Sequence, residues 1–99
     1  MRDIVDEAGV KRVVKKLLLT YGWYYWMPSA NAFGISGISD FNAVRNGRFL
    51  AIETKFGGNK PTPLQRRYLE QVAAHGALTM VVNERSLDKL EELLKVAEN

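Results

Sequence analysis

Apolar residues near the start of the chain recur every three or four positions, which is the spacing of one helix face. That face consists of Val10, Val13, Val14, Leu17 and Leu18, whereas Lys11, Arg12, Lys15 and Lys16 fall opposite. The pattern predicts an amphipathic helix over residues 3–20, and Gly22 is a suitable stop after it. An aromatic-rich run over residues 23–27 then predicts a strand, which Pro28 ends before a loop of small residues that contains Gly34 and Gly37.

The segment around Asn46 and Gly47 predicts a tight β-hairpin. Residues 38–45 and 48–56 are strand-like, and the Asn-Gly dipeptide between them suits a two-residue type I′ turn. Both positions of that turn need positive φ, which Asn and Gly adopt at little cost.

This turn also fixes which side chains of the two strands face each other. Arg45 is opposite Arg48 and, counting back along both strands, Asp40 is opposite Glu53. Lys55 projects from the same face as Glu53, because side chains alternate along a strand with period two. The hairpin therefore predicts two carboxylates and an ammonium on one face.

The remaining chain predicts a helix, a strand and a last helix. Thr62 as N-cap and Pro63 at the first helical position begin a helix that Gly76 closes. Its expected buried side consists of Tyr68, Leu69, Val72 and Ala73. Residues 77–82 form a nearly continuous apolar run, typical of a buried strand, which we expect to pair in parallel with the hairpin. Ser86 begins the last helix, whose apolar stripe consists of Leu87, Leu90, Leu93, Leu94 and Ala97. The order αβββαβα predicts an α/β fold with a mixed sheet flanked by helices.

Length and composition narrow the possibilities further. We expect the 99 residues to form a single domain, residues 1–99, because the chain is too short for two domains. No apolar stretch is long enough to cross a bilayer, and the acids at positions 3, 6 and 7 contradict a secretory signal, so we expect a cytoplasmic protein without a membrane partner. Because the chain has no cysteine and His75 as its one histidine, any metal would be held mainly by oxygen.

Positive charge gathers in the middle of the chain, although the net charge of +3 is modest. Six bases and one acid lie between Arg45 and Arg67, so this part of the chain could meet phosphate. For each residue taken singly, a solvated surface position explains the charge equally well.

The opposed carboxylates of Asp40 and Glu53 need something to offset their repulsion, which costs about 0.2–1 kcal/mol across a ladder. Carboxylate oxygens together with retained waters suit Mg²⁺, whose usual task is to bind substrate phosphate. In this hypothesis the two acids hold the ion, while Lys55 orients a water or neutralises charge in the transition state. The alternative is a solvated sheet face on which Lys55 forms a weak ion pair with Glu53.

These residues resemble the PD-(D/E)xK nuclease signature, and the αβββαβ order is similar to the restriction-endonuclease-like core. Within that superfamily, four segments look like the VRR-NUC (virus-type replication-repair nuclease) branch, especially its short stand-alone members in phages and bacteria. The four segments are Gly37-Ile38-Ser39-Asp40, Asn46-Gly47-Arg48-Phe49, Glu53-Thr54-Lys55 and Thr62-Pro63-Leu64-Gln65. Ser39 stands where the signature has its eponymous proline, and the acid that follows is retained.

The resemblance implies phosphodiester hydrolysis with Mg²⁺ or Mn²⁺ as the cofactor. It assigns Asp40 and Glu53 as metal ligands, the carbonyl of Thr54 as a further ligand and Lys55 as the catalytic lysine. Glu7 shares a helix face with apolar residues, and the family often places an additional acid near the metal there. The alternative for Glu7 is an acid that merely complements the helix dipole.

Gln65 also has two interpretations. It matches a glutamine that the family carries on the helix after the lysine strand, which makes it a candidate catalytic residue. Thr62 and Gln65 are, however, also spaced as a capping box, in which the Gln65 side chain would bond the backbone of Thr62.

Contacts with DNA follow from the same resemblance and from the distribution of charge. Candidate phosphate contacts are Lys60, Arg66 and Arg67, and also Lys11 and Lys15, for which an ordinary solvated helix face is the alternative. The aromatic residues Trp23, Tyr24, Tyr25 and Trp26 either stack on bases, build a dimer interface or line the core.

Stand-alone members look like homodimers that act on branched DNA such as four-way (Holliday) junctions, in a bacterial cell or a phage-infected host. Three alternatives remain open at this point. They are a general DNA endonuclease without junction preference, a catalytically silent nucleic-acid-binding module on the same fold, and a purely structural interaction domain.

Overall fold

In the computed structural model, which describes residues 3–29 and 34–97, the first helix starts later than the apolar pattern suggests. Helix α1 spans Glu7–Thr20 because Asp6 caps it: the Asp6 carboxylate accepts a hydrogen bond of 2.9 Å from the backbone N–H of Gly9. The predicted apolar face is buried at Val10, Val14, Leu17 and Leu18. The chain then turns at Gly22, whose φ of +76° favours glycine.

Four strands form one mixed sheet in the order β1-β2-β3-β4. They are β1 (Tyr24–Trp26), β2 (Phe41–Arg45), β3 (Arg48–Thr54) and β4 (Leu78–Val82). The first three are antiparallel neighbours, and β4 runs parallel to β3, as predicted. Asn46 and Gly47 have φ of +49° and +80°, which confirms the type I′ hairpin, and the predicted register is confirmed from its turn to the pair Phe41 and Ile52.

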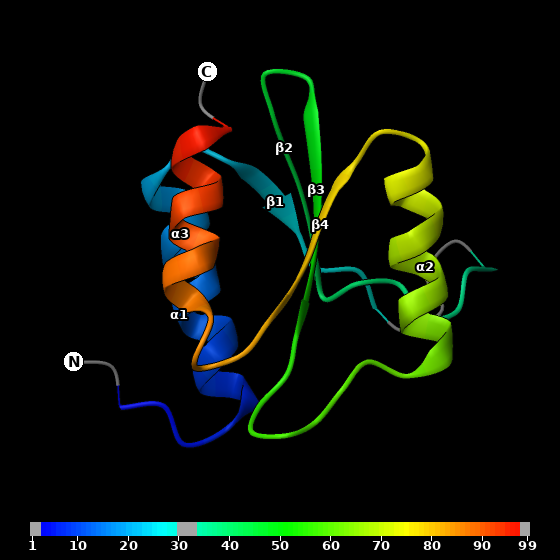
Figure 1. The fold of residues 1–99 in the computed structure, drawn as a ribbon. Coiled ribbons are helices and arrows are strands. Elements are labelled where there is room, and N and C mark those ends of the chain that lie inside the picture. The colour runs from blue at the N-terminus through cyan, green and yellow to red at the C-terminus, as the bar shows by residue number, and fades with distance from the viewer. Residues whose placement is uncertain (1–2, 30–33, 98–99) are drawn as a thin grey trace.

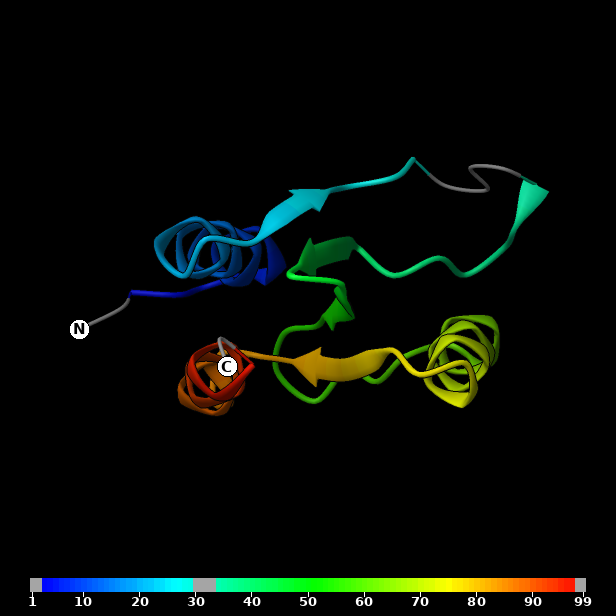
Figure 2. The ribbon, with the colours of Figure 1, turned by 90° about the horizontal axis from the view of Figure 1, so that it is seen from above.

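Helices cover the two faces of the sheet unequally (Figures 1 and 2). Helix α1 and helix α3 (Leu87–Val96) lie side by side on one face, whereas helix α2 (Pro63–Ala74) lies on the other face and packs against β4 and β3. This arrangement confirms the expected α/β fold, with the αβββαβ core followed by a C-terminal helix.

The main core lies between the sheet and the pair α1 and α3. It consists of Val10, Val14, Leu17, Leu18, Trp23, Phe41, Ala43, Leu50, Ile52, Val82, Leu87, Leu90, Leu94 and Ala97. Tyr25 packs against this cluster, whereas Tyr24 and Trp26 are exposed on β1. The core interpretation is therefore confirmed for Trp23 and Tyr25.

The α2 side of the sheet buries fewer side chains than the sequence suggests. Leu69 is buried in α2, but Ala73, predicted to be buried, is exposed. Strand β4 was predicted to be a buried strand, and that is wrong, because only Val82 is buried in it and Val81 is 41% exposed. The physical reason is position, since β4 is an edge strand with a single helix over its outer face.

Two helix starts differ in how they are capped. The Thr62 and Gln65 capping box is present in both directions at the start of α2. Ser86 precedes α3 as predicted, but its side chain makes no capping bond and instead accepts a hydrogen bond of 2.9 Å from the backbone N–H of Asn83.

Residues 30–33 of the predicted loop lie outside the described residues. Within the described ranges, no helix combines the length and the apolar character needed to cross a bilayer.

Candidate active site

The candidate site lies at the open end of the β2–β3 hairpin, where the ladder stops. Strand β2 begins at Phe41 and not at residue 38, so Asp40 sits just outside the last pair. Two features end the strand, one a contact with a distant segment and the other a local hydrogen bond. Gly37 has a φ of +76° and lies so close to α2 that a Cβ there would be 2.5 Å from the Leu64 backbone, and the Ser39 hydroxyl donates a hydrogen bond of 3.1 Å to the Phe41 carbonyl.

A buried network of polar side chains supports this bend. Ser39 and Asn42 are 1% exposed, and the hydroxyl of Ser39 lies 3.1 Å from the Asn42 side-chain oxygen. The Tyr68 hydroxyl of α2 donates to the same oxygen at 2.9 Å, and burial raises the pKa of Tyr68. Sequence reasoning missed this network. The signal available was a polar residue, Asn42, inside a strand that is otherwise apolar on both sides of it.

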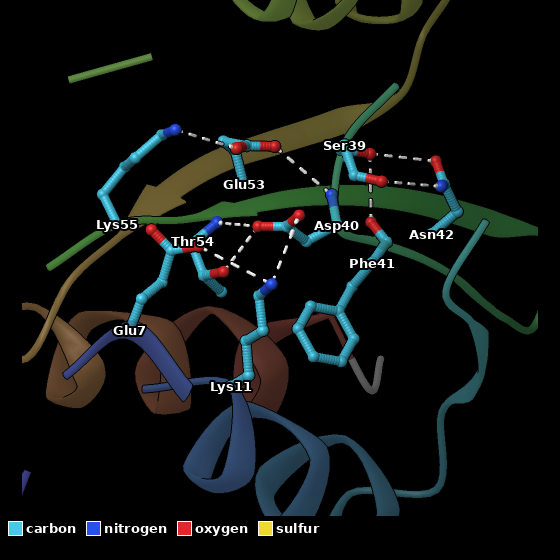
Figure 3. Close-up of polar contacts among 9 residues, drawn as sticks. All are labelled: Glu7, Lys11, Ser39, Asp40, Phe41, Asn42, Glu53, Thr54 and Lys55. Atoms are coloured by element: carbon cyan, nitrogen blue, oxygen red, sulfur yellow. Dashed lines mark hydrogen bonds and ion pairs between the residues drawn. The ribbon is translucent and has the colours of Figure 1, made fainter. Parts of the chain in front are cut away.

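Asp40 is held by the strand opposite (Figure 3). Its Oδ2 accepts hydrogen bonds from the backbone N–H and the hydroxyl of Thr54, the first at 3.0 Å. Its own backbone N–H donates to Oε1 of Glu53 at 3.3 Å. Asp40 therefore approaches Glu53 through its backbone while its carboxylate reaches Thr54, so that both acids meet at the end of β3.

Glu53 is a buried carboxylate that, among the residues the structure describes, has one cationic partner. Its side chain is 1% exposed, and Nζ of Lys55 lies 3.4 Å from its Oε2. The pKa of Glu53 is raised from 4.5 to about 7, because burial and, to a lesser degree, the negative charge of Asp40 raise it by more than Lys55 lowers it. The predicted set of Asp40, Glu53 and Lys55 is thus brought together, with the glutamate poised between its charged and neutral forms near neutral pH.

Helix α1 adds two residues to the same site. Nζ of Lys11 lies 3.6 Å from Oε2 of Glu7 and 3.8 Å from Oδ1 of Asp40, so the lysine bridges two carboxylates (Figure 3). Glu7 thereby lies near the hairpin acids. Lys11, predicted as a DNA contact, has its ammonium group directed at the site. The signal in the sequence was the four-residue spacing of Glu7 and Lys11, which places both on one helix face.

The remaining predicted residues lie on the surface near the start of α2 or along α1. Lys60, Arg66 and Arg67 are exposed, as is Lys15. Gln65 uses Oε1 to accept a hydrogen bond of 2.9 Å from the Thr62 backbone, so its capping role is confirmed. A catalytic role for Gln65 stays a prediction.

The oxygen atoms near Asp40 define what kind of ion the site could take. Across residues 3–29 and 34–97, no three Asp, Glu, His or Cys side chains are grouped closely enough to hold a metal by themselves. A site made from the carboxylates of Asp40 and Glu53 and a backbone carbonyl would leave coordination positions to water. Such a donor set suits Mg²⁺, which keeps several waters and binds through one or two carboxylates.

Comparisons with known proteins place the fold. No protein-family model matches the sequence, and no curated protein matches it. A solved structure described as "VRR_NUC domain" is 28% identical, with a TM-score of 0.76 over 90% of this chain and 97% of that chain. Another, described as "VRR_NUC domain protein", is 22% identical, with a TM-score of 0.71 over 96% of this chain and 91% of that chain. Both likenesses extend over nearly the full length of each protein.

Proposed function

The chain is a VRR-NUC domain, a nuclease-type fold, and on this premise we propose that it is a metal-dependent nuclease that hydrolyses phosphodiester bonds in DNA. The proposed cofactor is Mg²⁺ or Mn²⁺, and the proposed substrate is branched DNA such as a four-way junction, cut by a homodimer.

The observation that carries the proposal is the buried Glu53 carboxylate beside Asp40. A carboxylate that is 1% exposed loses most of its hydration, and a second carboxylate nearby makes its ionisation still less favourable. Such an arrangement is costly for a sheet whose only role is structural. It becomes favourable when a divalent cation joins the two acids.

The donor set fits Mg²⁺ or Mn²⁺. Asp40 and Glu53 would hold the ion, with the carbonyl of Thr54 and, at the edge of the site, Glu7 as further ligands. Among residues 3–29 and 34–97, the partner of Asp40 Oδ1 is Lys11 at 3.8 Å, whereas Oδ2 accepts both hydrogen bonds from Thr54. When bound, the ion would supply an activated water and stabilise charge on a phosphate oxygen.

The protein's own residues would do the remaining work. The Thr54 backbone and hydroxyl hold Oδ2 of Asp40, so Oδ1, whose partner is Lys11 at 3.8 Å, would be the oxygen that binds the ion. Lys55 is only 13% exposed and is anchored by Glu53, so its ammonium is held at the site, where it can orient a water and neutralise a phosphate. Gln65 would contribute from the first turn of α2 if its amide is released from the cap.

DNA would be held by exposed bases around the site. Lys60, Arg66 and Arg67 follow the catalytic strand, and Lys15 extends the positive surface along α1. A two-fold homodimer would present two such sites to the two symmetric strands of a junction. Support for the junction and for the dimer comes from the VRR-NUC resemblance.

A cleavage panel tests this proposal. The protein is incubated with a four-way junction, a flap, a linear duplex and a single strand, each in EDTA, Mg²⁺ or Mn²⁺, and its mass in solution is measured by light scattering. We expect metal-dependent paired nicks in the junction, a dimeric mass, and loss of cleavage in Glu53→Gln and Lys55→Ala. Glu92→Gln makes the same chemical change as Glu53→Gln at an exposed position of α3 and should cleave like the wild type.

Each other outcome has a definite meaning. Unchanged cleavage in Glu53→Gln would overturn the site. Indiscriminate cleavage of all substrates would favour a general endonuclease over a junction resolvase. DNA binding without cleavage under any metal condition would indicate the catalytically silent module.

A further inference from the structure

Lys11 is the one basic residue of α1 that the structure places within ion-pair distance of the hairpin acids, among the residues described. The helix start sets its position. Asp6 caps α1 through the N–H of Gly9, so Glu7 stands in the first turn and Lys11 follows one turn later on the same face. The bend before β2 then brings Oδ1 of Asp40 to this face.

The distances show that Lys11 is held loosely. Its Nζ lies 3.6 Å from Glu7 and 3.8 Å from Asp40, both longer than the roughly 2.7–2.9 Å of a charge-assisted hydrogen bond. Its side chain is 32% exposed, against 13% for Lys55. Lys11 therefore supplies positive charge between two carboxylates without a short bond to either.

We propose that Lys11 is a built-in counter-cation for the metal-binding carboxylates. Its ammonium lies beside them in the metal-free protein and must be displaced when a divalent ion binds. In the metal-free protein the ammonium would offset the repulsion between Glu7 and Asp40, and it would compete with the ion for Oδ1 of Asp40. Lys11 is thus a positioning residue that sets the affinity for metal. This inference rests on the proposed function, because it assumes that the metal binds at Asp40.

The two lysines of the site would then have separate tasks. Lys55 is more deeply buried and pairs with Glu53, so it would stay in place when the ion enters. Lys11 pairs with the Asp40 oxygen that Thr54 leaves free, so the ion and the ammonium would require the same atom. A loosely paired, partly exposed lysine is the cheaper one to move.

Metal affinity is the direct test. Mn²⁺ is titrated calorimetrically into the wild type, Lys11→Met, Lys11→Arg and Lys16→Met, and the melting temperature of each is measured with EDTA and with saturating Mn²⁺. Lys11→Met keeps the length of the side chain and removes its charge. We expect it to bind Mn²⁺ about tenfold more tightly, and to gain more melting temperature from Mn²⁺, because a competing positive charge has been removed.

Two controls isolate the position and the charge. Lys16→Met removes the same charge from an exposed position of the same helix and should keep the wild-type affinity within about twofold. Lys11→Arg keeps the charge and should bind Mn²⁺ like the wild type. If Lys11→Met does not fold, as judged by circular dichroism, Lys11→Gln is measured in its place with the same expectation.

The outcomes separate the two proposals. If the wild type binds Mn²⁺ and Lys11→Met binds it equally or less tightly, the counter-cation inference is wrong and the proposed nuclease stands. If the lysine-to-methionine changes at positions 11 and 16 tighten binding equally, the effect is one of net charge and the inference is also wrong. If no variant binds Mn²⁺, both proposals are wrong.

Discussion

At its turn, the β2–β3 hairpin is regular: Asn46 and Gly47 have positive φ, and the strand pairs continue inward without interruption. At the other end the ladder stops after Phe41 and Ile52, and side-chain hydrogen bonds replace backbone pairing. The turn end is thus built from backbone geometry that stabilises the fold. The open end contains carboxylates whose burial and mutual repulsion oppose folding. Such departures from favourable local structure are expected where a protein builds a functional site.

The largest expected effect comes from the open end. Asp40→Asn keeps an oxygen that can accept hydrogen bonds from Thr54 but removes the charge that would bind the ion. We expect the rate of metal-dependent DNA cleavage to fall about a thousandfold. The melting temperature in EDTA should stay equal or rise, because the charge next to Glu53 is lost. A full cleavage rate, or a large loss of stability, would show that Asp40 is structural.

Gly37→Ala tests the bend that carries Asp40. A Cβ at this position would lie 2.5 Å from the Leu64 backbone, in addition to the strain of a φ of +76°. We expect a loss of about 3 kcal/mol in the free energy of unfolding, measured with urea. Gly34→Ala is the matched control, since its φ is +72° but its Cβ would meet nothing within 4 Å. Equal losses in the two variants would contradict the close approach of this loop to α2.

Gly47→Ala tests the turn end, where only backbone conformation is at stake. A Cβ there would meet nothing within 4 Å, but φ is +80°. We expect unfolding to become easier by about 1–2 kcal/mol, with the cleavage rate per folded molecule unchanged. Gly58→Ala, at a position that is equally open but lacks positive φ, should be neutral or slightly stabilising. A slower cleavage rate in folded Gly47→Ala would mean that the two ends are coupled.

The last effect expected is a dependence of stability on pH. The pKa of Glu53 is about 7 in the folded protein and 4.5 as its ordinary value, so folding favours the neutral acid. The stabilisation is fully present below about pH 4.5 and is lost as pH rises through about 7. In EDTA, the wild type should therefore lose melting temperature between pH 5 and pH 8 relative to Glu53→Gln.

Saturating Mg²⁺ should reverse this trend, because the ion binds the deprotonated carboxylate and gains affinity as pH rises. Parallel melting curves for the wild type and Glu53→Gln across this pH range in EDTA would contradict a raised pKa for Glu53.

Sequence alone predicted the features that depend on local geometry. The hairpin turn, its register as far as the pair Phe41 and Ile52, and the Thr62 capping box follow from residues close together in the chain, and the structure confirms all three. The exit of Asp40 from the ladder did not follow, because it depends on Gly37 meeting α2, a contact between distant segments.

The position of Lys11 was missed for a related reason. A helix wheel shows which residues share a face, but not which strand end that face will meet. The exposure of β4 likewise depends on how much of the sheet a single helix can cover, so an apolar run was interpreted as a buried strand. In both cases the environment of the residues was determined by the packing of distant segments, which sequence periodicity does not reveal.

The most direct test of the proposed metal site is a crystal structure with Mn²⁺, in which anomalous scattering locates the ion. We expect one peak at the open end of the hairpin, about 2 Å from a carboxylate oxygen of Asp40 and of Glu53, with water in other positions. Strong Mn²⁺ peaks elsewhere, with Asp40 and Glu53 contacting only protein atoms, would contradict it.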